Sequence, residues 1–318
     1  MKHPDGKDFR PTTYLELNCS NFMKRYIVIA GLLVASLASV NTLNAQDDLL
    51  KGLEQEPTND FVLATFKGTR LINFHTLEVP GKRTLDFRIS HRFGPLNSGW
   101  YDFFGLDGGA SIRIGLEYSF DGRFCFGVGR TSYEKMLDGF LKYRLLRQKE
   151  SGWSPVSVTL FSSVYATMQR DPDKEANGFD KFEPFSNRLS FTHQIIIGRK
   201  FSERFSFQIS PTMIHYNLAE RISDKNDVYV LAAATRFKIT KRLALTLEYG
   251  YRPLGYSRSK YYDSLGIGVD IETGGHVFQL FATNSFGLVE NQFLAHTTDK
   301  WSDMGIRFGF NVSRVFSL

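Results

Sequence analysis

Apolar and polar residues alternate with a period of two from Thr84 to the end of the chain. In the segment TLDFRISHRF at 84–93, Leu85, Phe87 and Ile89 fall on one face, and charged or hydroxyl side chains occupy most of the other. Successive side chains of a β-strand point to opposite faces. Each alternating segment therefore predicts a strand with one apolar and one polar face.

The alternating segments are about ten residues long, which is the length that a tilted strand needs to cross a bilayer. Strands of soluble proteins average about five or six residues. The predicted strands cover residues 84–93, 111–120, 123–130, 135–147, 156–168, 188–199, 204–216, 227–238, 243–252, 263–272, 275–283 and 303–318. Their length and number predict an all-β fold, an antiparallel transmembrane β-barrel of about 12 strands.

The connections between the predicted strands alternate in length. Two-residue turns at 121–122 and 273–274 contrast with long loops at 169–187 and 284–303. Bacterial barrels have short periplasmic turns and longer outer loops. An even number of strands then places both ends of the barrel in the periplasm.

Residues 46–83 precede the barrel domain, which we place at 84–318. We expect them to form a lead segment that lies in the periplasm or folds into the lumen. Two parts of the lead, 61–66 and 69–77, have some strand character and would raise the count to about 14 strands if both joined the barrel.

A basic stretch followed by an apolar run predicts a cleaved signal peptide at 23–45. Met23-Lys24-Arg25 opens the basic stretch, the apolar run 26–40 follows, and cleavage is expected after Ala45. Residues 1–22 are polar, and we interpret them as an upstream extension from a mis-assigned start codon. No other apolar run reaches the roughly 18 residues of a transmembrane helix.

Composition agrees with a strand-rich exported chain. Aromatic residues make up 14% of the sequence, with 27 Gly and only 10 Pro, which suits strands and tight turns. The net charge of +6 is spread without runs of like charge, so no nucleic-acid partner is expected. Cys19 precedes the signal peptide, and Cys125 alone would remain, which leaves no intramolecular disulfide.

The sequence lacks the patterns of catalytic and metal sites. No His is followed two residues later by Ser, the spacing that places a base and a nucleophile on one strand face. His91 and His193 share the parity of apolar neighbours and are expected at the lipid face. No HxH, HExxH or paired CxxC motif occurs. We therefore expect no catalytic residue, no metal and no cofactor, and a chain that is not an enzyme.

The polar faces of the strands hold the candidate functional residues. Charges in a narrow lumen must pair or contact water, so they form either an ion-pair ladder or a pore lining. We expect Arg88, Arg113 and Arg144 to form one basic patch opposite the acidic residues of 243–252 and 263–272. The candidate lumen-lining residues are Asp86, Arg88, Arg92, Arg113, Glu117, Asp138, Lys142, Arg144, Glu248, Arg252, Asp270, Glu272 and Arg307.

Four motifs, FKGTR at 66–70, FRISHRFG at 87–94, YDFFGLD at 101–107 and GFLKYRLLR at 139–147, carry a family resemblance. They resemble a family of uncharacterised Gram-negative outer-membrane β-barrel proteins that is known only as a domain of unknown function. The resemblance runs from about Thr65 to the C-terminus. It implies a barrel in the outer membrane and no particular reaction or ligand.

The expected function is a passive channel or transporter for a small polar solute in the outer membrane. The alternative is a plugged structural or binding barrel without transport, followed by an integral hydrolase or a soluble periplasmic β-protein. The expected partners are outer-membrane lipid, the solute, and the barrel-assembly machinery, which would engage the C-terminal strand.

Overall fold

The computed structural model describes residues 61–150, 154–171, 174, 178–219, 224–254, 260–273 and 276–318. The upstream extension at 1–22, the signal peptide at 23–45 and the first part of the lead segment lie outside the described residues.

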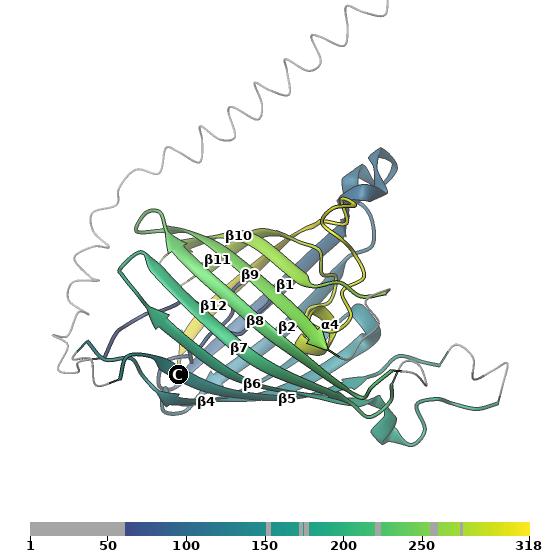
Figure 1. Ribbon diagram of the computed structural model, residues 1–318, viewed down its shortest axis with the longest axis horizontal. Coiled ribbons are helices and arrows are strands. Elements are labelled where there is room, and N and C mark those ends of the chain that lie inside the picture. Colours follow the sequence, from purple (N-terminus) through teal and green to yellow (C-terminus); the bar gives the residue numbers. More distant parts are fainter. Residues whose placement is uncertain are drawn as a thin grey trace, which may run out of the picture. The chain divides into compact units, whose positions relative to one another are not determined.

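Within the described residues, twelve antiparallel strands close into a barrel, in which strands adjacent in sequence pair with one another and β1 pairs with β12 (Figure 1). The strands are β1 (Thr84–Pro95), β2 (Ser111–Ser119), β3 (Phe124–Thr131), β4 (Met136–Leu146), β5 (Ser157–Thr167), β6 (Leu189–Lys200), β7 (Phe205–Tyr216), β8 (Asp227–Lys238), β9 (Leu243–Leu254), β10 (Ser264–Thr273), β11 (His276–Thr283) and β12 (Arg307–Ser317). Short helical turns occupy some connections: η1 (Leu96–Ser98), η2 (Trp100–Gly105), η3 (Tyr133–Lys135), η4 (Phe185–Arg188) and α4 (Glu290–Phe293). The predicted 12-stranded barrel is confirmed, and 61–66 and 69–77 add no strand to it.

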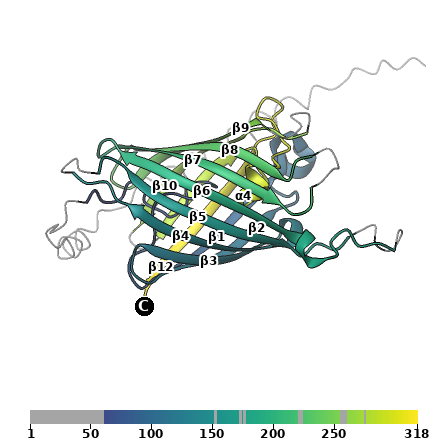
Figure 2. The same cartoon turned by 60° about the horizontal axis from the view of Figure 1, so that its bottom comes forward.

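The turn between β2 and β3 shows how the sequence reverses the chain. Gly122 has a φ of +77°, which glycine adopts at little cost. The Asp121 carboxylate accepts hydrogen bonds from the backbone N–H groups of Phe124 (2.7 Å) and Arg123 (2.8 Å), which hold the pKa of Asp121 below its ordinary value. This turn lies at the same end of the barrel as the C-terminus, here called the turn end (Figure 2). The opposite end, with the long connections, is the loop end.

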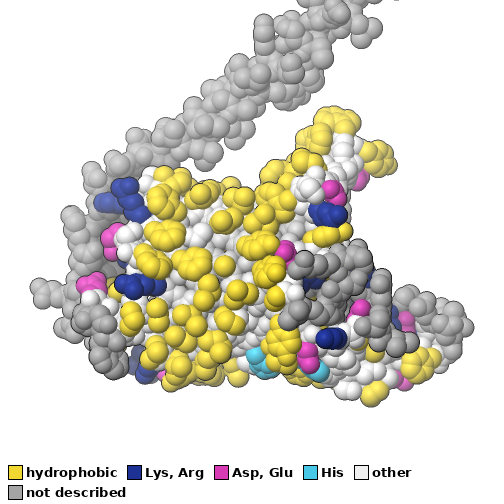
Figure 3. Space-filling view, viewed as in Figure 1, with side chains coloured by type: hydrophobic (Ala, Val, Ile, Leu, Met, Phe, Trp, Pro, Cys, Tyr) yellow, Lys and Arg dark blue, Asp and Glu magenta, His cyan; other side chains and the backbone are white. Residues whose placement is uncertain are grey.

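Side chains that point outward form an apolar belt. On β2 the exposure alternates strictly, with Ile112, Ile114 and Leu116 exposed by 40%, 52% and 42% and the residues between them buried. Figure 3 shows hydrophobic side chains covering the visible barrel wall. Such a continuous apolar band suits lipid and not water. Among the described residues, no helix has the length and apolar character to span a membrane.

Candidate functional site

The described end of the lead segment folds into the barrel as an internal plug, defined here as Phe66–Val79. It forms a hairpin, because the backbone N–H of Thr76 donates to Thr69 O (2.9 Å) and that of Leu71 to Phe74 O (3.0 Å). Leu71, Phe74 and most other plug residues are buried. The candidate strand at 69–77 therefore contacts the inside of the wall instead of extending it, whereas 61–66 leads into the plug and bridges Lys149 at Phe61.

Part of the inner face of β6 to β8 is apolar, beside inward Ser, Thr and Gln residues of β6 and β7. Ile196, Ile214 and Val230 point inward and are buried in one cluster with Phe74 and Leu77 of the plug. Burying a side chain of this size stabilises the folded state by about 1.5–3 kcal/mol. Inward apolar residues, which an open water-filled pore would disfavour, are explained by this contact.

The rest of the wall binds the plug through polar side chains, many of which donate hydrogen bonds to plug carbonyl oxygens. Lys142 Nζ donates to Glu78 O (2.6 Å), Gln208 Nε2 to His75 O (2.8 Å) and Thr159 Oγ1 to Leu77 O (2.8 Å). These contacts fix the path of the hairpin backbone, in addition to the contacts that its side chains make.

Glu248 of β9 holds the tip of the hairpin. Its carboxylate accepts hydrogen bonds from the backbone N–H of Asn73 (2.9 Å), the backbone N–H of Phe74 (3.1 Å) and the side-chain amide of Asn73 (2.5 Å). Arg92 Nη2 in turn donates to Asn73 Oδ1 (2.7 Å). The tip is thus fixed by a carboxylate and a guanidinium from different strands.

The same hairpin spans the joint between the first and the last strand. Arg92 of β1 (3.1 Å) and Asn311 of β12 (2.8 Å) both donate to Ile72 O. Arg92 Nη1 also donates to Asn311 Oδ1 (3.2 Å). One plug carbonyl therefore bridges the two strands whose pairing closes the barrel.

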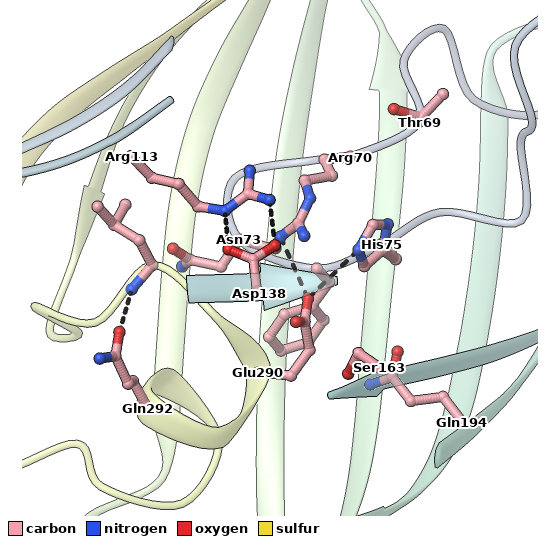
Figure 4. Close-up of polar contacts among 12 residues, drawn as sticks. Thr69, Arg70, Asn73, His75, Arg113, Asp138, Ser163, Gln194, Glu290 and Gln292 are labelled. Atoms are coloured by element: carbon pink, nitrogen blue, oxygen red, sulfur yellow. Dashed lines mark hydrogen bonds and ion pairs between the residues drawn. The ribbon is translucent and has the colours of Figure 1, made fainter. Parts of the chain in front are cut away.

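A second inward segment is the part of the β11–β12 connection around α4. Its Glu290 is almost fully buried and accepts hydrogen bonds from Arg70 Nη1 of the plug (3.1 Å) and from Tyr165 OH of β5 (2.7 Å). His75 Nε2 lies 3.6 Å from the same carboxylate (Figure 4). Glu290 therefore connects plug, loop and wall at one point.

Eleven of the thirteen predicted lumen residues are buried on the inner face. Glu272 and Arg307 are only half-buried, near opposite ends of the barrel, where they contact Arg236 and Asp299 respectively. The eleven are Asp86, Arg88, Arg92, Arg113, Glu117, Asp138, Lys142, Arg144, Glu248, Arg252 and Asp270.

The predicted basic patch is wrong, because each of its cations has its own carboxylate. Arg88 pairs with Asp86 (3.1 Å) and Arg113 with Asp138 (2.5 Å). Arg144 pairs with plug Glu78 (3.0 Å). The acidic residues expected opposite the patch do not form a free acidic group either. Glu248 binds the plug, and Asp270 and Glu272 both contact Arg236. Local neutralisation removes the transverse field that the patch would create.

Sequence reasoning missed the residues on the plug and on the inward loop. Arg70, Asn73, Glu78 and Glu290 lie outside the alternating segments, so parity gave no signal for them. Arg236 could have been found, because it follows the inward parity of its neighbours on β8.

Plug and wall fit closely at the charged sector. The cavity beside Arg70, Arg88 and Arg113 has a volume of about 10 Å³, which is at most one water molecule. A larger cavity of about 480 Å³ opens at the loop end, where Tyr216, Asn291 and other residues line it. Within the described part of the chain, no group of three or more His, Cys, Asp or Glu is placed to hold a metal ion.

A serine and a histidine meet on the lipid face. Ser162 of β5 and His193 of β6 are register partners, and Ser162 Oγ lies 3.0 Å from His193 Nδ1. They line an apolar groove of about 620 Å³ together with Pro211 and Met213. A pair formed across two strands leaves no His–Ser spacing within either strand, so the sequence pattern did not indicate it.

Comparisons with known proteins identify a family for this chain and solved structures with a similar fold. A family model described as a membrane bound beta barrel domain (DUF5777) matches residues 66–316. No curated protein matches. Similar solved structures include the NanC porin (8% identity, 74% of this chain and 99% of that chain, TM-score 0.46) and the KdgM porin (11%, 73% and 99%, 0.43). An outer membrane channel from Pseudomonas putida F1 is also similar (15%, 83% and 100%, 0.42). The family match and the apolar belt confirm the predicted outer-membrane location.

Proposed function

This chain belongs to the family of membrane-bound β-barrel domains (DUF5777), and on that premise we propose that it is a gated channel for small polar solutes whose gate is the plug. The observation that carries the proposal is the charged inner wall around the plug. Burying charges costs desolvation energy, and apolar side chains fill a permanently closed interior at lower cost. The inward apolar residues of β6 to β8 show that part of this wall does fill its contact with the plug by apolar side chains. The charged sector is therefore suited to an interior that water enters.

The topology allows the plug to move as one piece. Phe61 forms a bridge with Lys149 in the connection after β4, and Thr84 begins β1 opposite Ser119 and Ser317. Both ends of the plug therefore lie at the turn end, with the hairpin inserted between them. A hairpin of this kind can leave by the mouth through which it entered, and no strand has to unpair.

Weakening the tip contact should open the lumen more often. We expect Glu248→Gln to raise the swelling rate of proteoliposomes in small neutral sugars about threefold, since an amide cannot accept all three hydrogen bonds from Asn73 and Phe74. Asp138→Asn is the matched control. It removes a wall-to-wall ion pair with Arg113 and leaves the hydrogen bonds between wall and plug in place. Equal swelling for wild type and both variants would favour a closed structural barrel.

The Ser162–His193 pair makes a lipid-facing hydrolase the second candidate. We propose that the pair is not catalytic, because Ser162 meets Nδ1 and the described residues provide no carboxylate bonded to the other ring nitrogen. A fluorophosphonate probe applied to the reconstituted protein is expected to leave Ser162 unlabelled. Labelling that disappears in Ser162→Ala would instead identify an enzyme.

A further inference from the structure

The loop between β1 and β2 presents a cluster of large apolar side chains, here called the aromatic knob. Its members are Trp100, Tyr101, Phe103, Phe104 and Leu106, with Trp100 exposed by 75% and Tyr101 by 93%. Figures 1 and 3 show this segment standing out from the barrel wall beside the loop end of β1. Exposed apolar clusters of this size mark interaction surfaces.

The knob has a defined shape. The Trp100 ring packs edge-on against Phe103 and Phe104, with centroids 5.7 and 6.1 Å away. Phe104 N donates to Gly99 O (2.8 Å) inside the loop. Leu96 N donates to the carbonyl oxygen of Ile306 (2.8 Å), which ties the loop to the segment before β12. The ring packing and these backbone hydrogen bonds therefore give the exposed rings a defined arrangement.

The backbone of the aromatic knob has an unusual conformation. Phe103 and Phe104 have φ values of 46° and 55°, in the left-handed region that residues with a Cβ rarely adopt. Gly105, with a φ of +85°, lies so close to Gly94 that a Cβ would overlap the Gly94 carbonyl. Strained backbone persists where the surrounding structure enforces it, and it often marks functional sites. Here the two strained residues carry exposed aromatic rings.

The surroundings of the knob indicate what covers it. His91 and Phe93 on the outward face of β1 form a ring cluster with Phe310 of β12, with the His91 and Phe310 rings stacked at 5.0 Å. The knob follows directly on this cluster, so it continues the lipid-facing surface at the loop end. Residues 94–112 contain no Lys or Arg, so attraction to anionic groups cannot supply the binding energy. Burial of aromatic rings at a bilayer interface can.

We propose that the aromatic knob is a lateral membrane anchor that inserts its rings into the interface of the outer leaflet beside the barrel. The anchor uses Trp and Tyr where a bilayer favours them, at the boundary between hydrocarbon and head groups. It would fix the height and rotation of the barrel in the membrane, and it does not depend on whether the lumen conducts.

Fluorescence of Trp100 tests the anchor in the purified protein. With Trp153→Phe and Trp301→Phe, Trp100 becomes the sole tryptophan, and the protein is reconstituted in vesicles of phosphatidylcholine with or without bromine on the upper acyl chain. We expect blue-shifted emission, weak quenching by iodide and about twofold lower emission in the brominated lipid. Emission like that of a water-exposed tryptophan, with full iodide access, would overturn the proposal.

Two controls separate lipid from other occupants. A variant that keeps only Trp301, whose Nε1 donates to Leu265 O (3.2 Å), should respond less to brominated lipid than the variant that keeps only Trp100. Lowering the protein-to-lipid ratio should leave the Trp100 signal unchanged. Protection of Trp100 that is lost on dilution would show that a second copy covers the knob, and it would also overturn the anchor.

Discussion

Replacing the plug, Phe66–Val79, by a Gly/Ser linker of the same length is expected to raise conductance in planar bilayers at least about tenfold over the wild type. The linker cannot supply the side chains that pack against Ile196 and Val230, and it lacks the carboxylate that pairs with Arg144. Water would then enter between the charged wall residues. A peptide of residues 61–82, added from the turn side, should lower the conductance again.

The folded state of the linker variant must be checked separately. A folded barrel migrates differently on gels before and after boiling, so this shift serves as the control for insertion. A folded linker variant that conducts no better than wild type would contradict gating, and the plugged structural barrel would replace it. If the linker variant does not fold, Glu248→Gln still decides the question.

Glu290→Ala is expected to lower the free energy of unfolding by about 3–5 kcal/mol, because it leaves the Arg70 guanidinium buried without its carboxylate. It also removes the acceptor of the Tyr165 hydroxyl. The unfolding midpoint in urea, followed by the gel shift in lipid, measures the change. The double variant Arg70→Leu with Glu290→Leu should recover most of the loss, since removing both charges leaves neither one unpaired. A double variant as unstable as the single one would show that Glu290 acts through packing and not through charge.

The barrel was predictable because each strand carries its own signal. In β2 every second residue is apolar, and Asp121-Gly122 marks the turn that follows. Parity on the strands was also sufficient to place residues such as Asp86 and Arg113 on the inner face. These inferences need only neighbouring residues, which a single sequence provides.

The plug was not predictable in the same way, because its contacts join distant parts of the chain. Asn73 and Glu248 are separated by 175 positions, and no sequence pattern around either residue indicates that they contact each other. An ion-pair ladder was one of the two alternatives for the inward charges, but the partner of Arg144 was missed for the same reason, since Glu78 lies in the lead segment. One usable signal existed on β8, where Val228, Val230 and Ala232 place apolar side chains on the inner face. A wall that is apolar on both faces implies a filled lumen.

The carbonyl of Ile72, which bridges β1 and β12, has a consequence for biogenesis. Ile72 precedes every strand, whereas Asn311 belongs to the last one, 239 positions away. Contacts between residues so far apart in sequence form late in folding. The hydrogen bond between Ile72 and Asn311 can therefore form only once the final strand is in place beside β1. A newly exported chain would thus carry, before its first strand, the carbonyl group that bridges β1 and β12 once the barrel has closed.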